Sequence, residues 1–387
     1  MESQGRKELP RWLRSAILIL LGYLFLSSVN MMGGGFKLMG SSFTGRLLVL
    51  TKNPIAGLMV GVMATAIVQS STLVSSLLVA LVASGALDFH LAVPIIMGAN
   101  IGTTITSTLV AMSYVGRRGR FRRAFAAATM HDFFNIITCC ILFPLQATTG
   151  FLSNTAEWLA RWFSNLTHIT SAKNPLTLCL SLLEMGLEKL FLGVFGFSTL
   201  VAATALTFCA VALLFFSLYY LTKNMRSLMA GTVESVLDRY IFGRPVVALF
   251  VGIVITFLIH SSSVTTSLMV PLVTAGILTL EQVLPYMLGA NIGTTLTALC
   301  AAIGTGRTDA VAIALTHMLF NCIGVSLIFP VRRIRKIPVF LAKTLAALTL
   351  RSRWYAVVYI AITFFAIPGF FLFGVKYVKI ALSWVCG

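Results

Sequence analysis

Charged side chains, and acidic ones above all, are scarce in this sequence. Only 10% of the 387 residues are charged, with 11 Asp and Glu against 29 Lys and Arg, whereas 58% are hydrophobic. The mean hydropathy is +0.94. Soluble domains contain about 25% charged residues, so this composition excludes them and indicates a helical protein with several membrane crossings. The apolar runs are continuous rather than alternating, which excludes a β-barrel.

Three further features are missing, and each absence argues against a class of protein. The seven cysteines have no metal-ligand spacing, so we interpret them as small buried side chains. Basic residues stand between apolar runs instead of on one face, which argues against nucleic-acid binding. The first apolar run, from Ser15 to about Gly35, has no small-residue cleavage site, so it predicts a transmembrane helix rather than a signal peptide.

One polar pattern occurs twice in these apolar surroundings. Gln69–Thr72 reads Gln-Ser-Ser-Thr, and His260–Ser263 reads His-Ser-Ser-Ser. At the same offset, Gly-Ala-Asn-Ile-Gly-Thr-Thr at Gly98–Thr104 recurs at Gly289–Thr295. Lipid cannot satisfy such clusters of hydroxyls and amides, so they must be buried in protein or line a polar cavity. An internal repeat with a polar interruption in each copy indicates a membrane transport site.

Short apolar arms flank each polar tip. They are residues 57–68 and 73–87 in the first copy, and 246–259 and 264–278 in the second. The first pair would extend only ~18–22 Å as helices, which is less than the ~30 Å hydrocarbon core of a bilayer. We therefore predict two re-entrant helical hairpins with their tips near mid-membrane. A single polar-flecked helix over 57–85 is the alternative for the first copy.

We expect a broken transmembrane helix after each hairpin. Residues 91–112 would be interrupted around Gly98–Thr104, and residues 283–303 around Gly289–Thr295, because paired glycines let a backbone unwind. Such a break would free amides and carbonyls for ligands.

The layout predicts an all-α polytopic membrane protein with two inverted-topology repeats. Twenty of the 29 Lys and Arg residues lie in the N-terminal lead and in segments 116–123, 222–244 and 331–353, which this layout places together on the cytoplasmic side. The loop at 304–309 falls outside, so the two copies run in opposite orientations. The parts are a basic lead with a first transmembrane helix and a connector at 41–53 (1–53), repeat 1 with a return helix at 124–145 (54–145), a link with one central transmembrane span at 190–221 (146–244), repeat 2 with a return helix at 310–329 (245–330), and a basic loop with a last transmembrane helix (331–387).

The polar clusters suit an anion together with a small hard cation. Helix N-termini offer unpaired amides to an anion, whereas hydroxyl, carbonyl and amide oxygens suit sodium. Neither hairpin has a carboxylate between its arms, since Asp88 and Glu281 lie beyond them, and this disfavours an amine substrate. Hydroxyls that merely join helices would not explain two matched clusters. No Gly-x-Ser-x-Gly turn appears, so we do not expect an enzyme.

These blocks resemble the type II sodium–phosphate cotransporter family, in its short bacterial form. The resemblance rests on the two polar tips, on Pro94–Thr104, on Phe121–Asp132 and on Leu288–Thr297. It implies import of inorganic phosphate with sodium ions by alternating access, without an organic cofactor. It also implies an integral protein of the bacterial inner (plasma) membrane with a cytoplasmic N-terminus; a homodimer stays open. His260 departs from the family, which has Gln there.

The resemblance assigns roles to individual residues of this chain. Phosphate contacts fall to Gln69, Ser70, Ser71, Asn100, Ser262, Ser263 and Asn291. Sodium contacts fall to Thr72, Thr103, Thr104, His260, Ser261, Thr294, Thr295 and Thr297. Two pairs four residues apart share a helix face and are expected behind these groups, either as supports or as a plain interhelical clamp: His131 and Asn135, His317 and Asn321. The alternatives are a sodium- or proton-coupled carrier of sulfate or a dicarboxylate, and a membrane receptor that does not transport.

Overall fold

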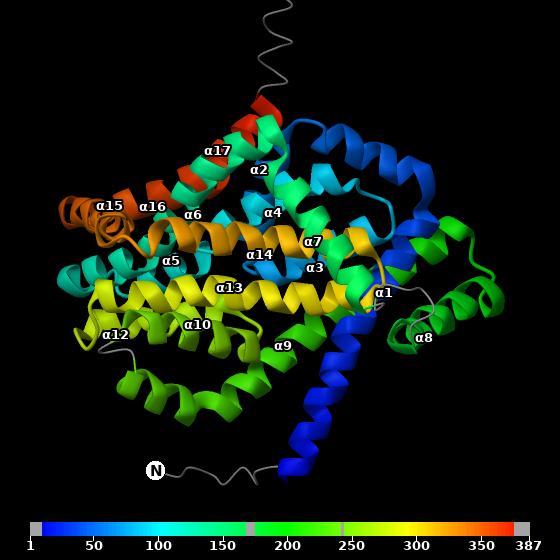
Figure 1. Cartoon of the computed structure of the whole chain (residues 1–387), viewed down its shortest axis with the longest axis horizontal. Helices are drawn as coiled ribbons and strands as arrows, with labels where there is room; N and C mark the ends of the chain where they lie inside the picture. The colour runs from blue at the N-terminus through cyan, green and yellow to red at the C-terminus, as the bar shows by residue number, and fades with distance from the viewer. Residues whose placement is uncertain (1–9, 168–174, 241–243, 375–387) are drawn as a thin grey trace, which may run out of the picture.

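The computed structural model describes residues 10–167, 175–240 and 244–374, and every regular element in these ranges is helical (Figure 1). Seven of the described helices are long and apolar enough to cross a membrane. This confirms an all-α polytopic membrane protein. The seven candidate spans are Trp12–Gly40, Phe89–Met112, Arg118–Thr149, Thr199–Leu228, Leu280–Gly304, Thr308–Ile328 and Trp354–Phe373.

Each predicted hairpin corresponds to two short apolar helical arms separated by a turn. Helix α2 (Pro54–Val68) is followed by α3 (Ser71–Ala83). In the second copy α10 (Pro245–Ile259) is followed by α11 (Ser262–Ser267), which continues into α12 (Met269–Ala275). Proline at the first position fixes the start of α2 and of α10, because its ring presets φ and its missing N–H is not needed there. The single-helix alternative for the first copy is therefore wrong.

The predicted helix breaks need correction. In the first copy, α4 (Phe89–Gly102) and α5 (Ile105–Met112) are separated by Thr103 and Thr104, whose backbone angles stay in the helical region. In the second copy, α13 (Leu280–Gly304) runs through the same motif without any break. The expectation of a broken transmembrane helix in both repeats is therefore wrong for repeat 2 and holds for one turn only in repeat 1.

The motif glycines serve close packing instead of unwinding. A Cβ on Gly98 would collide with the backbone of Leu58 in α2, and one on Gly289 would collide with the backbone of Leu249 in α10. Small residues let two helix backbones approach closely, which favours association in lipid because van der Waals contact is the main attraction there. Each hairpin's first arm is thus packed tightly along the crossing helix that follows it.

The return helices lie where the sequence predicts them, and the first extends beyond its predicted bounds at both ends. Helix α6 (Arg118–Thr149) and helix α14 (Thr308–Ile328) carry the matched His and Asn residues. Helix α14 runs beside α13 across the middle of Figure 1, and α7 (Phe151–Thr167) packs against α14. The link after repeat 1 is therefore helical from its beginning.

Two connecting segments differ from the sequence expectation. Helix α1 (Arg11–Thr51) includes most of the predicted connector at 41–53 and is kinked at Gly40, where φ is 72°. Residues 190–221 do not form one span, because α8 (Pro175–Lys189) and a π-helical turn (Leu190–Val194) end before α9 (Thr199–Tyr240) begins. Gly196, with φ of 61°, lies in the intervening turn, a conformation that favours glycine.

The last part of the chain contains a basic helix instead of the predicted basic loop. Helix α15 (Arg332–Arg351) packs against α6. It is followed by the last span, which consists of α16 (Trp354–Ala361), a π-helical stretch (Ile362–Ala366), α17 (Ile367–Gly369) and a second π-helical stretch (Phe370–Gly374). Pro368 lies between the two π-helical stretches. Because proline has no backbone N–H to donate, it interrupts the regular α-helical hydrogen bonds of this span.

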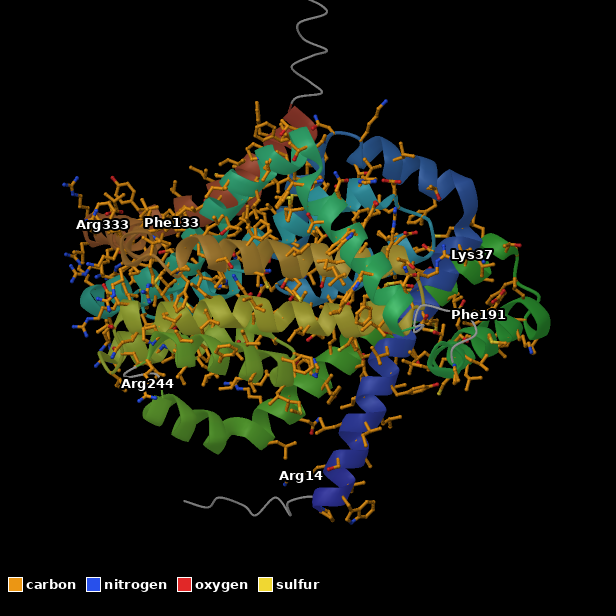
Figure 2. The ribbon with its side chains drawn as sticks, in the orientation of Figure 1. Arg14, Lys37, Phe133, Phe191, Arg244 and Arg333 are labelled. Atoms are coloured by element: carbon orange, nitrogen blue, oxygen red, sulfur yellow. The ribbon has the colours of Figure 1, made fainter. Side chains whose placement is uncertain are left out.

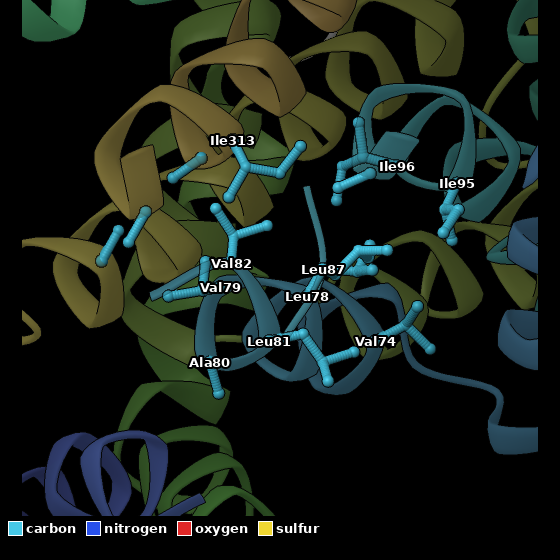
Figure 3. Packing of buried hydrophobic residues seen from close by; sticks show 14 of the residues in the cluster. Val74, Leu78, Val79, Ala80, Leu81, Val82, Leu87, Ile95, Ile96 and Ile313 are labelled. Atoms are coloured by element: carbon cyan, nitrogen blue, oxygen red, sulfur yellow. The ribbon is translucent and has the colours of Figure 1, made fainter. Parts of the chain in front are cut away.

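Two large apolar cores organise the bundle, and each includes part of one hairpin. In the first, Val74, Leu78 and Val82 of α3 pack toward Ile95 and Ile96 of α4 and Ile313 of α14, as Figure 3 shows. The second core joins α6, α10, α12, α13 and α15. The short helices on each side of a polar tip are thus packed against other helices of the bundle.

Candidate functional site

The two hairpin tips have the same backbone geometry. Gln69 ends α2 with φ 58° and ψ 25°, and His260 ends α10 with φ 60° and ψ 22°. Within the described ranges these two are the only residues other than glycine with positive φ. A side chain in this left-handed region costs ~1–2 kcal/mol. Such strain is typical of functional sites, where the surrounding structure holds it in place.

The residue after each tip caps the second arm. The Ser70 hydroxyl accepts a hydrogen bond from the Leu73 N–H at 3.3 Å, and the Ser261 hydroxyl accepts one from the Val264 N–H at 3.3 Å. The first amides of α3 and of the helix from Ser262 have no intrahelical acceptor. Two positive helix ends are therefore available at the tips for a negative ligand.

The tips of the two copies touch each other. Ser263 donates its hydroxyl to the carbonyl oxygen of Gln69 at 3.3 Å, and Thr106 donates to the same oxygen at 3.4 Å. Next to them, the hydroxyls of Ser107 and Thr266 are 3.1 Å apart. Residues that are far apart in the sequence thus form one polar centre between the copies.

A single cavity of about 710 Å³ lies at this meeting point. Its volume is in the range typical of small-molecule sites. Of the residues assigned to phosphate or sodium from the sequence, six line it: Gln69, Ser70, Thr72, His260, Ser261 and Ser263. Helix α9 closes one wall with Phe215, Leu218, Tyr219, Thr222, Lys223, Arg226 and Ser227.

The two cations on α9 were missed by the sequence analysis. Lys223 and Arg226 are exposed on the cavity wall, and the Lys223 Nζ lies 5.9 Å and 5.8 Å from the ring centroids of Tyr219 and Tyr220. We had assigned their segment to a polar region on the cytoplasmic side, outside the site. Their spacing of three residues, which puts them on one helix face, was the signal available in the sequence.

The remaining predicted site residues do not line the cavity. Ser71 and Ser262 are buried at the first position of their helices. Four threonines of the Asn-Ile-Gly-Thr-Thr motifs donate to backbone carbonyls three or four residues earlier in the chain: Thr103, Thr104, Thr294 and Thr295. Thr297 shares a hydrogen bond of 3.0 Å with His260 Nδ1, so it orients a tip side chain rather than facing the cavity.

Asn100 and Asn291 belong to a buried network that joins the two copies reciprocally. His131 of the first copy bonds through Nε2 to Asn291 Oδ1 of the second. His317 of the second copy bonds through Nε2 to Asn100 Oδ1 of the first at 3.2 Å. Asn135 donates to the Asn100 carbonyl at 2.7 Å and accepts from Asn291 Nδ2 at 2.9 Å.

Asn321 completes this network by donating to Asn100 Oδ1 at 2.9 Å. The side chains of Asn100 and Asn291 are thus engaged with the four His and Asn residues expected behind the site. All of these side-chain to side-chain contacts run between the copies, which the spacing of His and Asn within each copy does not predict.

Asp132 is a second feature that the sequence analysis did not place in the site. It is fully buried in α6, and the Tyr359 hydroxyl donates to its Oδ2 at 2.8 Å. Its Oδ1 has no hydrogen-bond partner among the described residues. The hydroxyls of Thr104 and Thr108 lie beside it. Thr104, just before α5, and Thr108, in α5, are four residues apart and lie on the same side of this helix. Thr106 lies on the opposite side and lines the cavity.

Comparison with known proteins now identifies the family. A model described as Na+/Pi-cotransporter matches residues 24–159 and 213–352. The chain belongs to this family. Both matched regions contain one hairpin and the crossing helices that follow it, and the unmatched stretch between them covers α8 and the start of α9.

Curated members of the family are similar over most of the chain. The sheep sodium-dependent phosphate transport protein 2A is 33% identical over 92% of this chain and 67% of its own length. The rabbit protein 2A is 31% identical over 97% of this chain and 70% of its own length. The human sodium-dependent phosphate transport protein 2B is 31% identical over 91% of this chain and 64% of its own length. No solved structure matched the chain.

The reciprocal network predicts a large loss of stability on removing one of its members. Asn291→Leu keeps the branched shape but leaves two buried atoms, His131 Nε2 and Asn135 Oδ1, without their hydrogen-bond partner, at ~1–3 kcal/mol for each buried group. The midpoint of thermal unfolding in detergent should fall by several degrees, and adding His131→Leu should recover part of that loss. Asn154→Leu, at an exposed asparagine, is the matched control; an equal midpoint in Asn291→Leu and Asn154→Leu would contradict this role.

Proposed function

We propose that this chain is a symporter that imports inorganic phosphate together with sodium ions by alternating access. The observation that carries the proposal is the meeting of two capped helix N-termini, one from each copy, at a single cavity with Lys223 and Arg226 on its wall. An anion is the ligand that such a site favours. The family, and the printed function of its curated members as sodium-dependent phosphate transport proteins, support phosphate as that anion.

The phosphate would be held at the tips rather than in the crossing helices. Gln69, Ser70 and Ser263 line the cavity and supply donors from an amide and two hydroxyls. The N-terminal amides of α3 and α11 point to the same tips. Asn100 and Asn291, which the sequence assigned to phosphate, are committed to the buried network, so we now assign them to holding the two copies together.

Sodium would be held next to the cavity by carboxylate and hydroxyl oxygens. Asp132 is a buried ionisable residue inside a candidate span, and such residues mark ion pathways by default. Its carboxylate, with the hydroxyls of Thr104 and Thr108 beside it, offers the hard oxygen ligands that sodium prefers. The tip residues Thr72, His260 and Ser261 remain candidates for a second sodium ion.

The two copies would be inverted repeats with re-entrant hairpins. In support, the four arms Pro54–Val68, Ser71–Ala83, Pro245–Ile259 and Ser262–Ala275 are all short. Helices of their length extend only ~20–23 Å, which is too short for a ~30 Å hydrocarbon core. Basic residues concentrate in segments that this topology puts on the cytoplasmic side of a bacterial inner membrane, and the N-terminus with them. Rocking of one copy against the other would expose the tips alternately.

Uptake by the purified protein in liposomes tests the proposed function. Labelled phosphate should enter only when sodium is higher outside than inside, because the sodium gradient supplies the driving force. Comparable entry of sulfate or a dicarboxylate would contradict the substrate, and uptake driven equally by protons would contradict the coupling. If no small anion enters, the chain is a receptor rather than a carrier.

The proposed sodium site predicts a specific effect of Asp132→Asn. The amide retains an oxygen for the Tyr359 hydroxyl but removes the charge that balances sodium, so the sodium concentration for half-maximal uptake should rise by roughly tenfold, about 1.4 kcal/mol. The control is Asp309→Asn, at an exposed carboxylate outside the site. A sodium dependence that stays unchanged in a folded Asp132→Asn protein would assign Asp132 a structural role only.

The cations on α9 predict a selective effect on phosphate affinity. Lys223→Gln and Arg226→Gln should each raise the phosphate KM roughly two- to fivefold, because an exposed charge is worth up to about 1 kcal/mol. The sodium dependence should stay unchanged, and the effect should shrink at high ionic strength. Lys189→Gln, at an exposed lysine away from the cavity, serves as the control. A KM effect of equal size in Lys189→Gln would contradict a local role.

The inverted repeat predicts opposite sidedness for two equivalent loops. Single cysteines at Gly119 and Arg307, both exposed positions, in a chain without its native cysteines, should be labelled from the cytoplasmic and the external side respectively. The measurement is labelling with a membrane-impermeant thiol reagent in oriented vesicles. If both positions react from the same side, the two copies are not inverted.

A further inference from the structure

A second cavity, remote from the hairpin tips, is lined by basic residues. It measures about 350 Å³ and lies where α10, α13 and α15 begin. Four cations and one carboxylate line it: Arg244, Arg332, Arg335, Lys336 and Glu281. Figure 2 shows Arg244 and Arg333 at the same end of the molecule, where nitrogen-tipped side chains gather.

The positive charge of this cavity is not balanced by the described residues. Glu281 forms an ion pair of 2.7 Å with Lys343, a cation that does not line the cavity. Among the described residues, Arg244, Arg332 and Lys336 have no carboxylate within ion-pair distance. Arg335 packs its guanidinium over the Phe329 ring, with its central carbon 4.8 Å from the ring centroid. A bound anion would therefore meet several cations without displacing an existing partner.

The uncapped N-termini of α15 and α10 also favour an anion at this cavity. Helix α15 has no acidic residue in its first turn and no side-chain cap, and α10 also begins without a side-chain cap. Cations at a helix N-terminus face the positive end of the macrodipole, which is unfavourable. A phosphate group placed there would accept hydrogen bonds from free amides and offset both sources of positive potential.

Apolar surface adjoins the basic cavity. Phe340 of α15 is 67% exposed and Val246 of α10 is 55% exposed, and Ile334 and Ile337 are exposed as well. A smaller cavity lined by Arg122, Arg123 and Lys343 continues the basic surface along α6 and α15. An occupant with both a phosphate and an apolar body matches this combination better than a free ion does. Basic pockets between transmembrane helices commonly bind phospholipid head groups.

We propose that this basic cavity is a binding site for the phosphodiester head group of an anionic phospholipid. The head group lies between Arg244, Arg332 and Lys336, and its acyl chains run over the exposed apolar residues of α10 and α15. The lipid ties the starts of α10 and α15 together on the side where the second hairpin begins. The site shares no lining residue with the transport cavity, so the proposal does not depend on which substrate is transported.

Native mass spectrometry of the purified protein in detergent tests the proposal. The probes are phosphatidylglycerol and phosphatidylcholine with identical acyl chains. The unmodified chain should bind phosphatidylglycerol at least fivefold more tightly than phosphatidylcholine. The double variant R332Q/K336Q, at two exposed positions, should reduce that affinity by roughly tenfold while phosphatidylcholine binding stays unchanged. The midpoint of thermal unfolding in phosphatidylcholine alone verifies that the variant is folded.

A matched control removes the same charge from the same end of the molecule. R117Q/R120Q changes two exposed arginines that line neither cavity, and it should alter the affinity less than twofold. Equal losses in the two double variants would overturn the proposal in favour of diffuse surface charge. Displacement of bound phosphatidylglycerol by millimolar glycerol phosphate or inorganic phosphate would instead assign the cavity to a free anion, and would overturn the lipid. If R332Q/K336Q unfolds, the single variants R332Q and K336Q are tested instead, and each should reduce the affinity for phosphatidylglycerol about threefold.

Discussion

The need to satisfy polar groups away from water governs this structure. A buried amide or imidazole in a membrane has no solvent to bond with, so each must find a partner within the protein. Here the partners come from the opposite copy: His131 bonds to Asn291, and His317 bonds to Asn100. This reciprocal exchange fixes how the copies face each other, and it is the reason that the tips of two separate hairpins arrive at one cavity.

Glycine makes that arrangement sterically feasible. Gly98 and Gly289 let each crossing helix approach the first arm of its hairpin until the backbones touch. Larger residues would push the arms outward and separate the tips, at which Ser263 now donates to the Gln69 carbonyl. The same glycines that suggested an unwound backbone in the sequence therefore act through packing. A pattern of small residues has both meanings, and only the position of the neighbouring helix distinguishes them.

Much of the fold could be predicted from hydropathy and from the residues that begin and end helices. The short helical arms on each side of the two polar tips and both return helices form where apolar runs, tip residues and prolines indicated helices. The errors fall in the connectors. Residues 41–53 and the region after Val331 are polar enough to suggest loops, yet both are helical. In each, tertiary packing overrides a weak local preference, since α15 is held against α6 and α1 runs along α9.

The sequence by itself determined that this protein is embedded in a membrane, that it repeats one polar motif, and that Gln69 and His260 mark the tips of that motif. These properties are local, because they depend on composition and on spacing along one segment. Only the tertiary structure decided that Lys223 and Arg226 line the cavity, that Asp132 is buried beside Thr104 and Thr108, and that Asn100 and Asn291 hold the copies together. Those facts depend on which helices become neighbours, and helix pairing is set by surface shape and by the mutual satisfaction of buried polar groups rather than by any one segment.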